Sequence, residues 1–201
     1  MLFVGQVLSP EAVADCTAWA AEKGHVALRA SQTLAAHYNQ VLSAGPDPAL
    51  ADGLRHQLAD PHAPAVLRLE LARVLYHHQE LDRPVLRQLI DPSAPAPLRL
   101  IGVEALLAAG DPGEGGEAVA ALYELGRLPN RELALSTADV VQRRLGVDLG
   151  LPPGEALPAV HSRLAAEVAR RLLAWSTQPP AQAEAEEQTP EESGWRTLTE
   201  I

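Results

Sequence analysis

Two ten-residue segments of this sequence are nearly identical and begin 31 residues apart. Residues 60–69 read DPHAPAVLRL and residues 91–100 read DPSAPAPLRL, so eight of the ten positions agree. The agreement extends beyond the segments, because Leu75 matches Leu106 at the same spacing. A period of this length is typical of arrays in which each repeat is a pair of helices, and it predicts such an array here.

Weaker copies extend the pattern in both directions. The leucines that open the second helix of each pair are Leu28, Leu67, Leu98 and Leu133, at spacings of 39, 31 and 35 residues. Hydrophobic residues make up 47% of the chain and aromatic residues only 3%, so Leu, Ala and Val must form most of the core. Since Leu and Ala are strong helix formers, composition also favours an all-α chain.

Capping and turn residues divide the chain into helices. The first begins at Ser9-Pro10-Glu11, and residues 113–116 are interpreted as a loop before a helix that starts at about residue 116. A last helix is predicted over residues 159–176, so residues 1–176 form the repeat domain. Residues 177–201 hold six acids and one base among many Pro, Gln and Ala, and predict a largely disordered acidic tail.

The repeat resembles the HEAT family, including the HEAT-like repeats of phycobilisome-lyase-type proteins. In those repeats a turn with Asp is followed by a helix that opens with an apolar residue and Arg, as in Leu67-Arg68 and Leu98-Arg99. The resemblance covers about residues 9–176 and is specific over 50–109, because the copy at Leu133 has Ala134 in place of Arg. It implies a right-handed α-solenoid of about four HEAT-like helix pairs with a C-terminal capping helix.

Each central turn pairs an aspartate with an arginine one helical turn later. An aspartate just before a helix can cap it, and the arginine can bond that aspartate or the one in the next repeat. We interpret these residues as a structural ladder between layers, with a ligand contact as the alternative. The four residues are Asp60, Arg68, Asp91 and Arg99.

The resemblance also implies that the second helix of each pair lines a concave face. Polar residues follow helical spacing there, opposite the apolar stripe, and would form a mixed-charge ridge. A partner-binding ridge and an ordinary solvated face are both open interpretations, although solenoids often bind through such faces. The candidate partner-binding residues are Glu70, Arg73, His77, Glu104, Asp139 and Arg143, with Ser136 between them.

The motifs of common catalytic and metal centres are not found in this sequence. None of the seven histidines precedes a glutamate, so the His-Glu dipeptides of HEAT-like di-iron hydroxylases are missing. Cys16 is the single cysteine and lies in an apolar helical stretch, so we expect a buried, inert thiol, with a reactive thiol as the alternative. We therefore assign no catalytic, cofactor-binding or metal-binding residue, and expect no cofactor.

The charge balance and the apolar runs bear on partners. The formal net charge is −10, whereas nucleic-acid binding needs a cationic surface, so no nucleic acid is expected. No run is long enough for a membrane span, which favours a cytoplasmic protein. Lys23 is the one lysine, and the Arg, Ala and Pro content is bacterial-like and typical of a GC-rich genome.

The leading hypothesis is a non-enzymatic protein–protein interaction or scaffold module that binds a protein or peptide along the concave face. One alternative is a HEAT-like enzyme or accessory subunit of the lyase or DNA-glycosylase type. The other is a structural oligomerisation unit in which Trp195–Ile201 dock on a neighbour. The sequence predicts neither the partner's identity nor the oligomeric state.

Overall fold

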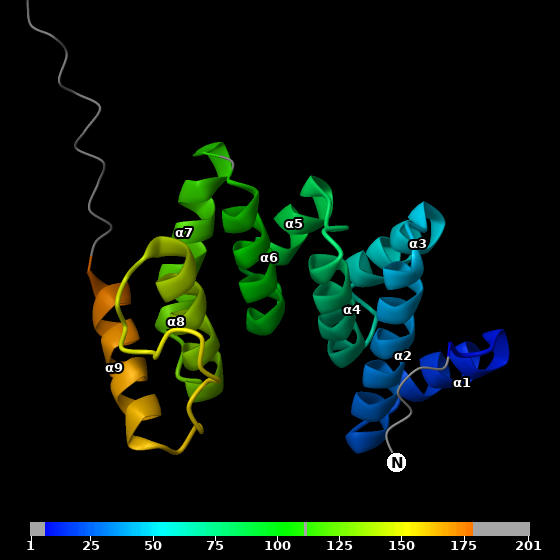
Figure 1. Ribbon diagram of the computed structural model, residues 1–201, viewed down its shortest axis with the longest axis horizontal. Coiled ribbons are helices and arrows are strands. Elements are labelled where there is room, and N and C mark those ends of the chain that lie inside the picture. The colour runs from blue at the N-terminus through cyan, green and yellow to red at the C-terminus, as the bar shows by residue number, and fades with distance from the viewer. Residues whose placement is uncertain (1–6, 111, 179–201) are drawn as a thin grey trace, which may run out of the picture.

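The computed structural model describes residues 7–110 and 112–178, and Figure 1 shows these residues as an assembly of helices. Within these two ranges the chain forms nine helices and no strand, which confirms the all-α prediction. The helices are α1 (Pro10–Ala20), α2 (His25–Ala44), α3 (Pro48–Ala59), α4 (Ala65–His77), α5 (Arg83–Ile90), α6 (Ala96–Ala109), α7 (Pro112–Gly126), α8 (Arg131–Leu145) and α9 (Arg163–Thr177).

Five of the helices begin at a side-chain cap. In each case a Ser, Asp or Asn side chain accepts a hydrogen bond from the backbone N–H three residues later, which satisfies one of the free donors of the first turn. α1, α3 and α5 also carry a proline in the first turn, where its missing N–H costs nothing. The caps are Ser9, Asp47, Asp82, Asn130 and Ser162.

Four helices form one continuous row, because α2 packs against α4, α4 against α6, and α6 against α8. We call these the row helices. Each has a partner that precedes it in the chain: α1 packs on α2, α3 on α4, α5 on α6, and α7 on α8. α9 packs on α7 and α8 at the C-terminal end. Figure 1 shows the row crossing the molecule from α2 at the right to α8 at the left.

The buried apolar side chains form two clusters. The first extends from Cys16 on α1 to Leu98 on α6, and the second extends from Leu86 on α5 to Leu172 on α9. α5 and α6 belong to both clusters, since their opposite faces point to different sides. Most members are Leu, Ala or Val, as the composition predicts.

Gly102 on α6 allows α5 and α6 to pack closely. A Cβ at this position would lie 2.8 Å from the Cβ of Leu89 and 3.1 Å from Cγ2 of Ile90. These distances are shorter than ordinary van der Waals contact, so any side chain here would push the two helices apart.

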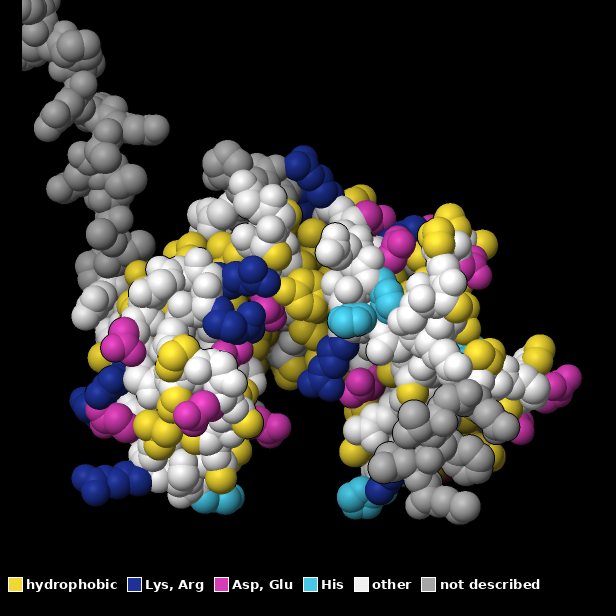
Figure 2. Space-filling model, in the orientation of Figure 1, with side chains coloured by type: hydrophobic (Ala, Val, Ile, Leu, Met, Phe, Trp, Pro, Cys, Tyr) yellow, Lys and Arg dark blue, Asp and Glu magenta, His cyan; other side chains and the backbone are white. Residues whose placement is uncertain are grey.

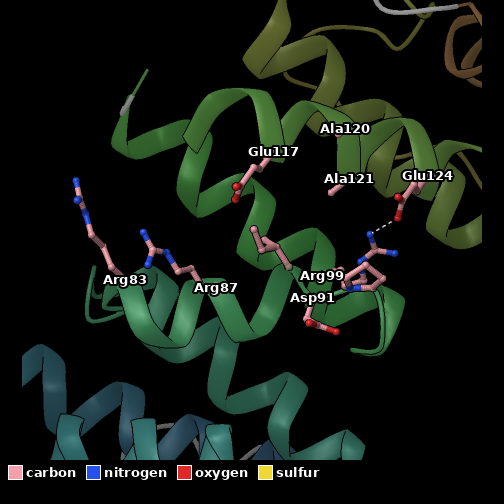
Figure 3. Close-up of a pocket in the computed structure, with 10 residues that line it drawn as sticks. Arg83, Arg87, Asp91, Arg99, Glu117, Ala120, Ala121 and Glu124 are labelled. Carbon is pink, nitrogen blue, oxygen red and sulfur yellow. Dashed lines mark hydrogen bonds and ion pairs between the residues drawn. The ribbon is translucent and has the colours of Figure 1, made fainter. Parts of the chain in front are cut away.

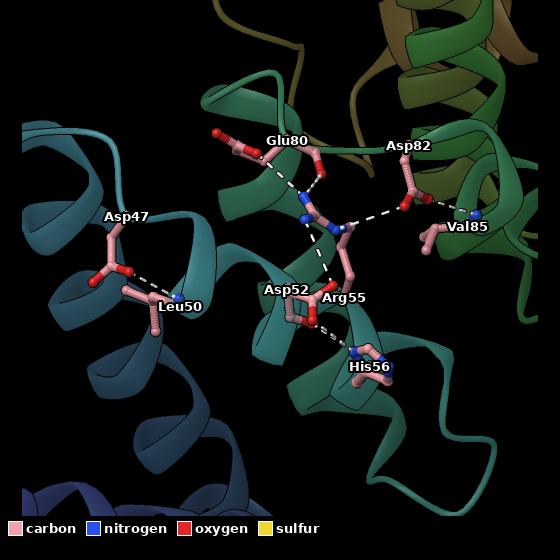
Figure 4. A network of polar contacts seen from close by, with 8 residues as sticks. All are labelled: Asp47, Leu50, Asp52, Arg55, His56, Glu80, Asp82 and Val85. Carbon is pink, nitrogen blue, oxygen red and sulfur yellow. Dashed lines mark hydrogen bonds and ion pairs between the residues drawn. The ribbon is translucent and has the colours of Figure 1, made fainter.

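Arg55 on α3 joins its layer to the next one (Figure 4). Its Nη1 donates to the carbonyl oxygen of Glu80 at 3.0 Å and to the Glu80 carboxylate at 3.2 Å. Its Nε lies 3.6 Å from the carboxylate of Asp82, which also caps α5. One arginine therefore fixes the connection between α4 and α5 against α3.

The leucine anchors of the repeat are buried in three of the four layers. Leu67 and Leu98 are 1% exposed and Leu133 is 7% exposed, whereas Leu28 is 38% exposed. Trp19 near the end of α1 is 49% exposed. Leu28 and Trp19 are exposed because, among the described residues, no earlier helix pair covers the outer side of α1 and α2.

Two helix starts differ from the prediction. α7 begins at Pro112 and includes residues 113–116, which we had interpreted as a loop; a proline in the first turn is compatible with this start. α9 begins at Arg163, later than predicted, because the Ser162 hydroxyl accepts from the N–H of Ala165 at 3.0 Å. The prediction of a disordered tail lies almost wholly on residues 179–201, outside the described residues.

Candidate functional site

The row helices carry two adjoining hollows. The first, of about 290 Å³, lies between α2 and α4. The second, of about 450 Å³, lies between α4, α6, α8 and the segment that holds Leu157. Arg73 on α4 borders both hollows, which therefore adjoin, and we call the two hollows together the groove. Figure 2 shows the molecule hollowed between its α2–α4 side and its α8–α9 side, with basic side chains on both borders and apolar ones between them.

All of the candidate partner-binding residues border the groove. They reach it because the spacing of three, four and seven residues places them on one face of each row helix. Whether this face binds a partner stays a prediction. The first hollow is lined by Glu70, Arg73 and His77, and the second by Arg73, Glu104, Asp139 and Arg143, together with Ser136.

Arg143 on α8 is held by two carboxylates. Its Nε donates to Oδ2 of Asp139 at 2.9 Å, and its Nη1 donates to Oε1 of Glu104 on α6, also at 2.9 Å. The hydrogen bond to Asp139, and then the bond to Glu104, raise the pKa of Arg143 far above its ordinary value against the opposing effect of burial. The charge of this arginine is therefore largely neutralised within the chain.

Two further residues extend this network to α4, and the sequence did not indicate them. Nη2 of Arg144 donates to the hydroxyl of Tyr76 at 3.0 Å and lies 3.6 Å from Oε1 of Glu104. Burial, and then the nearby Glu104 carboxylate, raise the pKa of Tyr76. The network thus ties α4, α6 and α8 together across the second hollow. A partnership across 68 residues leaves no local signal in the sequence.

The first hollow has its own polar contacts. Nη1 of Arg73 donates to Oε1 of Glu70 at 2.8 Å, one helical turn away. The ring of His77 meets the ring of His78 edge to face, with their centres 5.0 Å apart. Nε2 of His78 lies 2.7 Å from Oδ1 of Asn39, which joins α4 to α2.

The two turn aspartates do not cap the helices that follow them. The N-caps of α4 and α6 are Pro64 and Pro95, and neither makes a side-chain cap bond. Oδ1 of Asp60 accepts from the N–H of His62 at 2.8 Å, inside its own turn. The capping prediction is wrong, because each aspartate lies a full turn before its helix and folds onto the nearer N–H groups.

Asp91 behaves in the same way as Asp60. Its carboxylate accepts from the Ser93 hydroxyl and from the Ser93 N–H, and these two bonds lower the pKa of Asp91. The side chain is thus engaged inside its own turn, and it serves to shape the connection between α5 and α6.

The two arginines of the expected ladder reach different partners. Nε of Arg68 donates to the carbonyl oxygen of Leu58 at the end of α3, at 2.9 Å. Nη2 of Arg99 donates to the carboxylate of Glu124 on α7, whereas its buried Nε has no acceptor. Both arginines join adjacent helices, but neither hydrogen bond is made to a turn aspartate.

A third hollow, of about 790 Å³, lies between α5, α6 and α7 (Figure 3). Arginines and carboxylates alternate around it. Figure 3 shows Arg83 and Arg87 on α5 facing Glu117 on α7, and Arg99 turned toward Glu124. Opposite charges therefore face each other across this hollow, and the formal charges of its lining residues sum to zero.

These features define an all-helical protein with a polar groove along one row of helices. None of the described helices is both long and apolar enough to cross a membrane. Among the described residues, no three His, Cys, Asp or Glu side chains are placed to hold a metal ion. Cys16 is buried, and burial raises the pKa of its thiol. No known protein family, curated protein or solved structure matches the chain.

Proposed function

We propose that this chain is an α-solenoid of HEAT-like helix pairs that binds a segment of a partner protein along the groove, without catalysing a reaction. The observation that carries this proposal is that the two hollows adjoin at Arg73. Together they cross all four row helices, which is the face that helical repeat proteins use for binding. The successive packing of the row helices supports the solenoid arrangement.

The chemistry of the groove also supports binding to a protein segment. Both of its arginines are held by ion pairs with carboxylates of the groove, so these side chains lose little conformational entropy when a partner binds. Its floor offers apolar area between these charges, as interfaces between proteins commonly do. The apolar lining of the second hollow consists of Leu69, Pro97, Leu100, Ile101, Leu133, Val140 and Leu157.

Photo-crosslinking tests the proposal. A benzophenone amino acid is placed at Ala36 in the first hollow, at Ser136 in the second, and at Ala120 in the hollow between α5, α6 and α7 as the control. In lysate of the source cells, Ala36 and Ser136 should yield adducts to the same protein, whereas Ala120 should not. Equal labelling from all three positions, or different proteins from Ala36 and Ser136, would contradict a single partner in the groove.

A further inference from the structure

The two arginines that border the groove are already paired within the chain. Arg73 bonds Glu70 at 2.8 Å, and Arg143 bonds Glu104 and Asp139 at 2.9 Å. An acidic partner would have to compete with these carboxylates for both arginines. The apparent basic borders of the groove are therefore poor sites for an incoming carboxylate.

Glu132 is the charged residue of the second hollow whose carboxylate is not engaged in this way. It lies in the first turn of α8 and is exposed. Its backbone carbonyl accepts from the Ser136 hydroxyl at 3.3 Å, but within the described ranges its carboxylate has no ionic partner. The helix dipole favours a carboxylate at this position on the rim of the groove.

Leu157 places apolar surface beside the same hollow. It comes from the segment between α8 and α9 and is 44% exposed, whereas Leu133 and Leu100 on the floor are 7% and 8% exposed. An exposed leucine next to a recessed apolar floor can bury substantial area against one apolar side chain of a partner.

The overall charge of the groove agrees with these details. Its lining includes two arginines and four carboxylates, so the net formal charge of the groove is negative. A negative groove attracts cationic segments and disfavours acidic ones.

We propose that the occupant of the groove is a cationic amphipathic segment, with a Lys or Arg that meets Glu132 and a neighbouring apolar side chain that packs against Leu157 and Ile101. This inference rests on the proposed function and specifies the chemistry of the partner. It predicts that the conspicuous arginines of the groove organise the surface, while the carboxylate at the rim selects the partner.

A random dodecapeptide library displayed on phage tests this chemistry. The full chain is the target, and the Leu157→Ser variant serves for counter-selection, because it removes the apolar side chain without adding charge and Leu157 is exposed enough to change without loss of core packing. We expect enriched peptides to carry Lys or Arg next to Leu, Ile or Phe. The best peptide is then synthesised with a fluorophore and titrated by anisotropy.

Glu132→Gln should weaken this peptide about fivefold, which is the effect of losing one solvent-exposed ion pair. Glu11→Gln is the matched control, since Glu11 also lies in a helix first turn but is on α1, and it should leave affinity unchanged. Binding to the unmodified chain should also weaken with added salt.

The outcomes separate the two proposals. Enrichment of acidic peptides that depend on Leu157 would overturn the inference and leave the proposed function standing, as would equal effects of Glu132→Gln and Glu11→Gln on a groove-dependent peptide. Failure to enrich any peptide that distinguishes the chain from Leu157→Ser would count against both proposals.

Discussion

Oε1 of Glu104 on α6 accepts a hydrogen bond from Nη1 of Arg143 on α8 at 2.9 Å, although 39 residues separate them in the chain. The Glu104 side chain is only 16% exposed, and Nη2 of Arg144 lies 3.6 Å from the same oxygen. The carboxylate on α6 thus holds two arginines of α8 and links these two row helices beside the second hollow.

Glu104→Gln should lower the free energy of unfolding by about 1 kcal/mol, because Arg143 loses one of its two carboxylates in a half-buried setting. Urea denaturation followed by circular dichroism measures this loss. Glu167→Gln on α9 is the control, since Glu167 pairs only with Arg170 and Arg171 of its own helix and is well solvated. Equal losses for the two variants would show that the contact between α6 and α8 adds nothing.

Gly102→Ala should destabilise the protein by about 1–3 kcal/mol, since the new Cβ would lie 2.8 Å from the Cβ of Leu89. Gly53→Ala is the matched variant, because Gly53 is also inside a helix but has open space around the added methyl group. It should stabilise the protein by about 0.5–1 kcal/mol through helix propensity alone. Thermal and chemical denaturation of both variants check the opposite signs.

The Arg99–Glu124 pair should respond unequally to the loss of each member. The Arg99 side chain is 8% exposed, whereas that of Glu124 is 54% exposed. Glu124→Ala leaves a buried guanidinium without a partner and should cost about 2 kcal/mol. Arg99→Met removes both the buried charge and the Nε that has no acceptor, so it should be nearly neutral.

Denaturant titrations of the Arg99–Glu124 variants decide this prediction. The double variant Arg99→Met with Glu124→Ala should be more stable than Glu124→Ala alone, because the uncompensated charge is gone. If Arg99→Met proves as costly as Glu124→Ala, the pair stabilises the fold by more than its desolvation costs.

His37 on α2 should make the protein less stable in mild acid. Its Nδ1 accepts from the N–H of Leu8 at 3.1 Å, so the neutral ring is the form that makes this bond. Burial lowers the pKa of His37 below its ordinary value of 6.5, and the unfolded chain therefore binds the proton first. The contribution of neutral His37 to stability is fully present above pH 6.5 and falls as the pH decreases below it. The fall levels off once His37 is also protonated in the folded state.

Calorimetry at about pH 7 and about pH 5 tests the role of His37. The His37→Gln variant should lose less thermal stability over this interval than the unmodified chain, because its side chain does not titrate. An identical pH dependence for the two proteins would assign the acid sensitivity to other groups.

The repeat in the sequence predicted most of the helices, because buried leucines recur with the period of the helix pairs. Leu67 and Leu98 are almost fully buried for this reason. Leu28 departs from this pattern, since burial at the end of a row depends on a neighbouring layer that the sequence pattern does not reveal. Helix starts were predicted best where a Ser or Asp cap precedes a proline, as at Ser9.

The candidate site was predicted in part. Helical spacing placed Glu70, Arg73 and Glu104 on the groove, since residues on one face of a helix stay together. The contacts of Arg144 with Tyr76, and of Arg55 with Glu80, join different helices at distances set by packing, and no local pattern encodes them. The sequence did not single out Glu132, because its carboxylate differs from the others in the groove only in lacking an ion pair within the described part of the chain, and ion pairs depend on packing.

The division of the core at α5 and α6 has a mechanical consequence. Each cluster is cohesive, and the two meet at α5 and α6, with Tyr76 of α4 also packed against the second cluster. We expect the molecule to bend most easily at this boundary between the two clusters. The first hollow lies beside the first cluster, whereas the second hollow spans the boundary between the clusters. Such bending would therefore change the position of one hollow relative to the other.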